Sequence, residues 1–190
     1  MPDKEEERRS EFMDAAEKLF KENGIVDTTI NSIVKELDVA KGLFYYYFKS
    51  KDDVIDAISE KYNEAFNEMM KASMDRPGFD ERLDQYIDNC IASFARLHQQ
   101  LKGKGEDVDL TPLVNRSMEE ARNASIVGLE KLLQEGVSTG KLSIRYPHQY
   151  AVIIVTSIIT LVKEKEDNAL ITEIIMTLLG RVGKEEEEYV

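Results

Sequence analysis

The chain has 190 residues, which suits one domain or two small ones, and 42% of them are hydrophobic, which excludes global disorder. A single cysteine, Cys90, leaves no disulfide within the chain and excludes a small secreted module held together by disulfides. The net charge of −12 argues against a nucleic-acid partner when only the total is considered.

Helical periodicity runs along the chain, and strand signals are nearly absent. The charged start lacks the apolar stretch of a secretion signal, and the first predicted helix ends at Gly24, a residue suited to a left-handed C-cap. Asp27 or Thr28 can cap a second helix that ends near Asp38. A brief third helix is predicted over about residues 41–47.

The later predicted helices are longer. Ser50, with Asp53 three residues later, has the pattern of an N-cap for a fourth helix that reaches about Met74. The apolar run at 150–162 is shorter than the roughly 20 residues that a membrane span needs, so we expect a soluble cytoplasmic protein. Further helices are predicted at about 80–101, 112–138, 147–162 and 168–181.

These elements predict an all-α fold of about nine helices, arranged as a small N-terminal module and a larger helical body. Residues 1–50 are expected to form a helix-turn-helix DNA-binding domain. Residues 51–183 are expected to form a ligand-binding and dimerisation domain, and residues 184–190 an acidic, disordered tail.

The segment 28–51 combines three features of a DNA-binding helix-turn-helix. Its two short helices are joined by a turn of three or four residues, which forces the steep crossing that places a second helix in the major groove. Asp38 stands at the turn, where Asp tolerates a left-handed backbone better than most residues. Three consecutive tyrosines at 45–47 cannot all be buried on one helix, and four lysines against two acids give a local charge of +2.

The stretch from Ala15 to Lys51 resembles the N-terminal DNA-binding domain of TetR-family regulators. The resemblance covers about residues 9–56, and its most specific part is the run from Tyr45 to Lys51. Asp38 and Val34 stand where family members usually have glycine and alanine.

The resemblance implies which side chains contact DNA. Thr29 and Lys51 correspond to phosphate-contacting positions, and residues 41–43 begin the recognition helix, where base contacts commonly arise. Phe44 and Phe48 correspond to packing positions. The predicted DNA-binding residues are Thr29, Lys41, Gly42, Leu43, Tyr45, Tyr46, Tyr47 and Lys51, although Tyr46 can equally face solvent.

The predicted helix at 148–162 is apolar on nearly every side and therefore has to be buried all round. We expect it to pair, together with the last helix, with the same helices of a second copy in a two-fold four-helix bundle, as the resemblance also implies. The alternative is a central core helix in a monomer. The predicted interface residues are Val152, Val155, Ile159, Ile171, Ile175 and Leu178.

Soft and aromatic side chains on the body helices suit an adaptable effector pocket if the body is TetR-like. The same residues at helical spacing also suit an ordinary core, and Cys90 lacks the basic neighbours that would activate its thiol. The candidate pocket residues are Met69, Met70, Tyr86, Cys90, Phe94, Met118 and Arg122.

We therefore predict a transcriptional regulator: a ligand-released homodimeric repressor that binds a palindromic DNA operator, with an unknown small-molecule effector. An enzyme is disfavoured because the sequence has two histidines, one cysteine and no phosphate-binding glycine loop, and we expect no cofactor or metal. An adaptor that has lost DNA binding is the alternative, which the acidic charge and Asp38 favour. A helical enzyme would need a substrate site that the sequence does not indicate.

Overall fold

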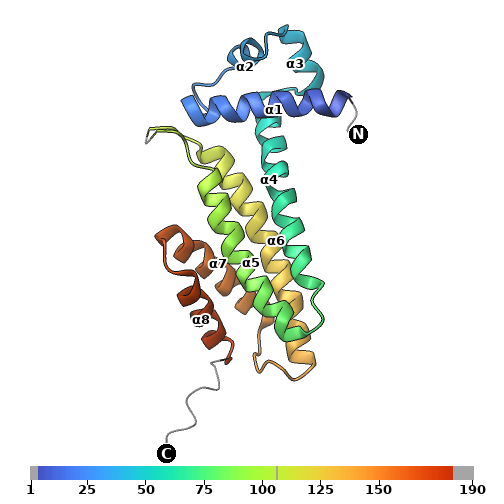
Figure 1. Ribbon diagram of the computed structural model, residues 1–190, viewed down its shortest axis with the longest axis vertical. Helices are drawn as coiled ribbons and strands as arrows, with labels where there is room; N and C mark the ends of the chain where they lie inside the picture. Colours follow the sequence, from blue (N-terminus) through green and yellow to red (C-terminus); the bar gives the residue numbers. More distant parts are fainter. Residues whose placement is uncertain (1–3, 106, 182–190) are drawn as a thin grey trace, which may run out of the picture. The chain divides into compact units, whose positions relative to one another are not determined.

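The computed structural model describes residues 4–105 and 107–181, and these residues form eight helices and no strand (Figure 1). The all-α prediction is confirmed, with eight helices in this part of the chain rather than about nine. None of these helices is long and apolar enough to cross a membrane. The helices are α1 (Lys4–Asn23), α2 (Ile30–Glu36), α3 (Lys41–Tyr47), α4 (Lys51–Met74), α5 (Phe79–Gln100), α6 (Thr111–Ser138), α7 (Pro147–Glu164) and α8 (Asn168–Leu178).

The chain divides into two compact units whose limits fall inside helices. The first unit holds the described residues up to Ala65 together with Leu97–Glu119, and the second holds Phe66–Arg96 and the described residues from Glu120 onward. The predicted domain boundaries at residues 50 and 183 stay predictions. The predicted tail lies outside the described residues.

Aromatic side chains form the centre of the first unit. The ring of Phe12 on α1 meets Phe44 of α3 edge-to-face, with centroids 5.8 Å apart, and lies 5.7 Å from the ring of Tyr47. Phe20 of α1 and Ile33 of α2 are also fully buried. Burying each such side chain contributes about 1.5–3 kcal/mol, so the apolar face of α1 fixes α2 and α3 against it.

The connection from α1 to α2 is built from local hydrogen bonds. Gly24 has a φ of +84°, and its N–H donates to the carbonyl of Phe20 at 2.8 Å, which confirms the predicted C-cap. The predicted cap of α2 needs correction, because Thr29 caps this helix rather than Asp27 or Thr28. The hydroxyl of the buried Thr28 instead donates to the carbonyl of Gly24 at 2.7 Å.

In the second unit, α5 packs closely against α6 at one glycine. A Cβ atom at Gly128 would lie 2.2 Å from the Tyr86 hydroxyl oxygen, so Tyr86 occupies space that only glycine leaves open. The Tyr86 hydroxyl donates to the carbonyl of Ser125 at 3.0 Å, which satisfies its polar group in a buried position. Helices α7 and α8 lie side by side in the same unit (Figure 1).

Candidate nucleic-acid interface

The turn between α2 and α3 has the hydrogen bonds of a Schellman motif. Asp38 has a φ of +52°, which confirms the predicted left-handed position. Its N–H donates to the carbonyl of Lys35 at 3.2 Å, and the N–H of Val39 donates to the carbonyl of Val34 at 3.0 Å. The motif ends α2 sharply and leaves only residues 37–40 before α3 begins.

Helix α3 buries one face and exposes the other. Phe44 is fully buried and Phe48, just after the helix, is nearly so, which confirms both as packing residues. On the other face Tyr45 is 49% exposed and Tyr46 is 67% exposed. The Lys41 ammonium lies 5.9 Å from the centroid of the Tyr45 ring, so cationic and hydroxyl groups share the exposed face.

Gly42 and Leu43 lie at the start of the same helix. Gly42 is exposed, and a Cβ atom there would meet nothing within 4 Å, so no packing within the described chain requires glycine. Leu43 is half-buried. Tyr47 is also half-buried, and its ring contacts with Phe12 and Tyr46 give it a packing role that the three-tyrosine pattern did not indicate.

Thr29 and Ser32 form a capping box at the start of α2. The Thr29 hydroxyl accepts the Ser32 N–H at 3.1 Å, and the Ser32 hydroxyl oxygen accepts the Thr29 N–H at 3.0 Å. Thr29 remains exposed. Its side chain therefore fixes the start of α2 while its position stays open to a phosphate.

The side chain of Lys51 has a structural role that the sequence did not indicate. Its ammonium donates hydrogen bonds to the main-chain carbonyls of Ile25, of Val26 at 3.5 Å and of Thr28 at 2.8 Å. Lys51 thus ties the first residue of α4 to the α1–α2 connection. The contact of Lys51 with a DNA phosphate stays a prediction. A phosphate would have to compete with these three carbonyls for the ammonium protons.

The predicted N-cap of α4 is confirmed. The N–H of Asp53 donates to the Ser50 hydroxyl oxygen at 3.1 Å, and the Asp53 carboxylate accepts the Lys49 N–H at 2.8 Å. The hydrogen bond from the Ser50 hydroxyl lowers the pKa of the Asp53 carboxyl below its usual value. Lys49 takes part in this cap only through its main chain, and its side chain is exposed.

Lys49, two residues after α3, and Lys35, in the last turn of α2, are two further exposed lysines of the helix-turn-helix segment. Neither was among the predicted contact residues. The local excess of lysine in residues 28–51 was the signal that could have included them.

The α5–α6 loop also reaches the α1–α2 connection within the first unit. The carbonyl of Asp109 accepts the N–H of Ile25 at 3.0 Å, and the N–H of Lys104 donates to the carbonyl of Lys21 at 2.7 Å. The Lys104 ammonium also pairs with the Glu22 carboxylate at 2.6 Å. A segment far along the chain therefore helps to hold the residues that lead into α2.

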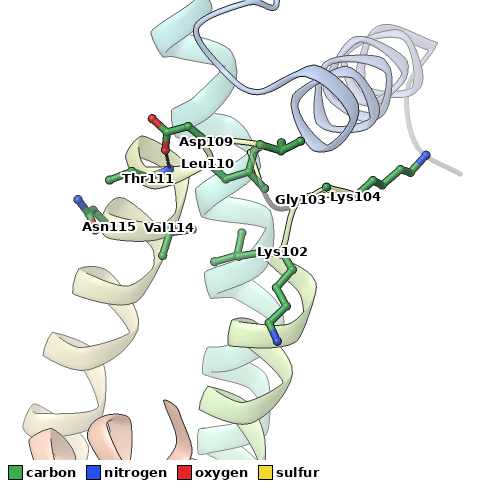
Figure 2. Close-up of a pocket in the computed structure, with 11 residues that line it drawn as sticks. Lys102, Gly103, Lys104, Asp109, Leu110, Thr111, Val114 and Asn115 are labelled. Carbon is green, nitrogen blue, oxygen red and sulfur yellow. Dashed lines mark hydrogen bonds between the residues drawn. The ribbon is translucent and has the colours of Figure 1, made fainter. Parts of the chain in front are cut away.

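A cavity of about 590 Å³ lies beside this loop and the start of α6 (Figure 2). The Asp109 carboxylate caps α6 by accepting the N–H of Thr111 at 2.8 Å. Figure 2 shows that the side chains of Lys102 and Lys104 point apart, so they do not converge on one anion. None of the predicted pocket residues lines this cavity.

The predicted pocket residues are buried or half-buried. Those in the second unit that carry sulfur form a sulfur-rich cluster between α4 and α5: Met69, Met70 and Cys90. The Cys90 thiol lies 3.6 Å from the sulfur of Met70, and the Ser93 hydroxyl donates to the sulfur of Met69 at 3.0 Å. Burial raises the pKa of the Cys90 thiol to about 12, so this thiol is protonated at neutral pH.

The other predicted pocket residues on α5 and α6 lie in both units. Phe94 is fully buried, and its ring centroid lies 5.1 Å from that of Phe66. Arg122 is half-buried in the second unit. Met118 is half-buried and belongs to the first unit.

Half of the predicted dimer residues are buried within one chain, and the predicted interface stays a prediction. Val155, Ile171 and Ile175 are at most 1% exposed within a single chain, so they pack in its own core instead of on a surface. The other half are accessible: Val152 and Ile159 are half-buried, and Leu178 is exposed. The large apolar side chains exposed on α7 and α8 are Ile153, Leu170, Ile174 and Leu178.

Comparison with known proteins identifies relatives of the N-terminal region. Residues 12–58 match the sequence model described as bacterial regulatory proteins, tetR family. A 50-residue segment is 50% identical to the HTH-type transcriptional regulator HbdR of Aromatoleum sp. (strain CIB), and it covers 26% of this chain and 22% of that protein.

Two further comparisons extend into the body. Over 138 residues the chain is 26% identical to the fatty acid metabolism regulator protein of Bacillus subtilis (strain 168), covering 70% of this chain and 69% of that protein. A solved TetR/AcrR-family transcriptional regulator from Thermobifida fusca is similar with a TM-score of 0.68 at 25% identity, covering 91% of this chain and 96% of that one. Each of these relatives is named as a regulator.

Proposed function

We propose that this chain, whose N-terminal domain belongs to the TetR family of bacterial regulatory proteins, is a DNA-binding repressor that acts as a homodimer. The dimer binds a palindromic operator, and a small-molecule effector releases it from that DNA. The observation that carries the proposal is the exposed face of α3, behind a left-handed turn at Asp38. Lys41, Tyr45 and Tyr46 project from that face and suit phosphate oxygens and base edges.

The DNA contact is tested with duplex DNA from the chain's own upstream region, by fluorescence anisotropy over a range of salt concentrations. Tyr45→Ala and Lys41→Ala should each weaken binding about tenfold, and Lys41→Ala should reduce the slope of log K against log salt by about 1. Lys131→Ala, an exposed lysine in the second unit, is the matched control. Unchanged binding for both α3 variants would contradict the proposed face, and absence of salt-dependent binding would favour the adaptor.

Dimerisation is supported by the apolar surface that α7 and α8 leave open in one chain. Ile153 is 52% exposed and Ile174 is 44% exposed. Both line a shallow groove of about 580 Å³ with Thr156 and Leu161. Exposed apolar patches of this kind typically mark a protein interface, and a second copy would cover them by two-fold symmetry.

The effector is proposed to carry an apolar chain and to enter the sulfur-rich cluster around Met70, Cys90 and Phe94. The likeness to a fatty acid metabolism regulator supports an acyl chain as the first candidate. The operator complex is titrated with a long-chain acyl-CoA, and coenzyme A alone is the control. Release by the acyl-CoA only is expected, while release by neither compound would contradict an acyl effector.

A further inference from the structure

The first turn of α1 places acidic side chains beside the exposed face of α3. Glu5, Glu6 and Glu7 are all exposed in this turn. Glu5 contacts α3 directly, because its carboxylate accepts a hydrogen bond from the Tyr46 hydroxyl at 3.3 Å. Tyr46 is one of the residues proposed to meet DNA, so a carboxylate lies where a phosphate would approach.

Packing fixes this juxtaposition in place. The ring of Tyr46 meets that of Tyr47 edge-to-face, with centroids 4.9 Å apart, and Tyr47 packs against Phe12 of α1. The Arg9 guanidinium lies 5.2 Å from the centroid of the Phe48 ring, which gives a second contact between the start of α1 and the end of α3. The position of Glu5 relative to Tyr46 therefore follows from the core of the first unit.

A stabilising effect on α1 does not account for the contact. Acidic residues in a first turn interact favourably with the positive end of a helix, but Glu6 and Glu7 share that role equally. Tyr46 has one hydroxyl proton to donate. The negative charge of Glu5 raises the pKa of this hydroxyl above its usual value, so the hydroxyl stays protonated and can donate to the carboxylate.

We propose that Glu5 limits the DNA affinity of this face: its carboxylate competes with a DNA phosphate for the Tyr46 hydroxyl and repels that phosphate. The inference rests on the proposed function. Phosphate contacts carry no sequence information and are made in both operator binding and non-specific binding. Glu5 therefore weakens binding to the operator and to arbitrary DNA by about the same factor.

The test compares E5Q with E7Q, which removes the same charge from the same turn of α1. Dissociation constants are measured for the upstream duplex and for a scrambled duplex of equal length at low salt. E5Q should tighten binding to both duplexes by a similar factor of about three to five, and E7Q by clearly less. The gain in affinity from E5Q should fade at about 0.5 M salt, where the Debye length is only a few ångströms and the charge of Glu5 is screened from the phosphate. Equal effects of E5Q and E7Q would overturn the inference.

A second variant isolates the hydroxyl. Y46F removes the hydrogen bond to Glu5 and keeps the ring contact with Tyr47. If the hydroxyl mediates the competition, adding E5Q to Y46F should gain clearly less than adding E5Q to the wild type, because only the repulsion of the phosphate is left to remove; an undiminished gain would overturn this role. Wild-type protein that binds no DNA would instead overturn the proposed function itself. Thermal unfolding of each variant verifies that the fold is retained.

Discussion

At the residue scale, Lys51 shows how one side chain can serve geometry where a contact with DNA was expected. Its ammonium donates to three main-chain carbonyls of the α1–α2 connection. A buried or half-buried carbonyl that loses its donor costs free energy of folding. A structural role of Lys51 and a contact of Lys51 with phosphate therefore predict different outcomes when the ammonium is removed.

Lys51→Met keeps the apolar stem and removes the ammonium. We expect the free energy of unfolding to fall by about 1–3 kcal/mol while the salt slope of DNA binding stays unchanged. Lys49→Met is the matched control: its side chain is exposed, and the hydrogen bond to Asp53 comes from its main chain. This variant should leave stability unchanged and reduce the salt slope. Chemical denaturation and anisotropy are the measurements, and the opposite pattern would assign Lys51 to phosphate.

At the scale of the element, α3 carries a glycine that its own packing does not require. Gly42→Ala adds a methyl group that meets nothing within 4 Å. Alanine is more favourable than glycine in a helix by about 0.5–1 kcal/mol, so the variant should be slightly more stable. If the backbone of α3 approaches DNA at this point, operator affinity should nevertheless fall several-fold. A variant that gains stability and keeps full affinity would remove Gly42 from the DNA face.

The elements themselves were largely predictable from local signals. Gly24, Asp38 and the Ser50–Asp53 pair marked helix ends correctly, because caps depend on a few neighbouring residues. Thr29 was missed as a cap because Asp27, Thr28 and Thr29 are all residue types that favour the N-cap position. Local chemistry can narrow such a choice to neighbours, but the path of the incoming chain decides it.

The direction of each helix face was less predictable. Helix α7 is apolar nearly all round, so its periodicity could not tell the side that packs in one chain from the side left open. Val155 packs inside and Ile153, two residues earlier, is exposed. The contacts of Lys51 and Glu5 join residues more than 20 positions apart, and no local pattern encodes them.

At the scale of the whole molecule, the proposed dimer is testable through the exposed residues of α7 and α8. Ile174→Asp places a charge in the open groove and should weaken dimerisation at least tenfold, because an unpaired charge would be buried at the interface. Val127→Asp is the control, since this exposed side chain lies on α6 in the same unit. Sedimentation should show wild type and Val127→Asp as dimers at micromolar concentration. A wild-type monomer would reject the dimer.

The main-chain bonds between the α5–α6 loop and the α1–α2 connection bear on protein engineering. Lys104 and Asp109 supply hydrogen bonds to Lys21 and Ile25, so the first unit is assembled from two separate stretches of chain. A chimeric regulator made by exchanging only the first 50 residues would place a foreign α1–α2 connection against this loop and would lose the ion pair between Glu22 and Lys104. To transfer the DNA-binding unit into another regulator, residues up to 65 should be exchanged together with residues 97–119, because these two stretches form one compact unit.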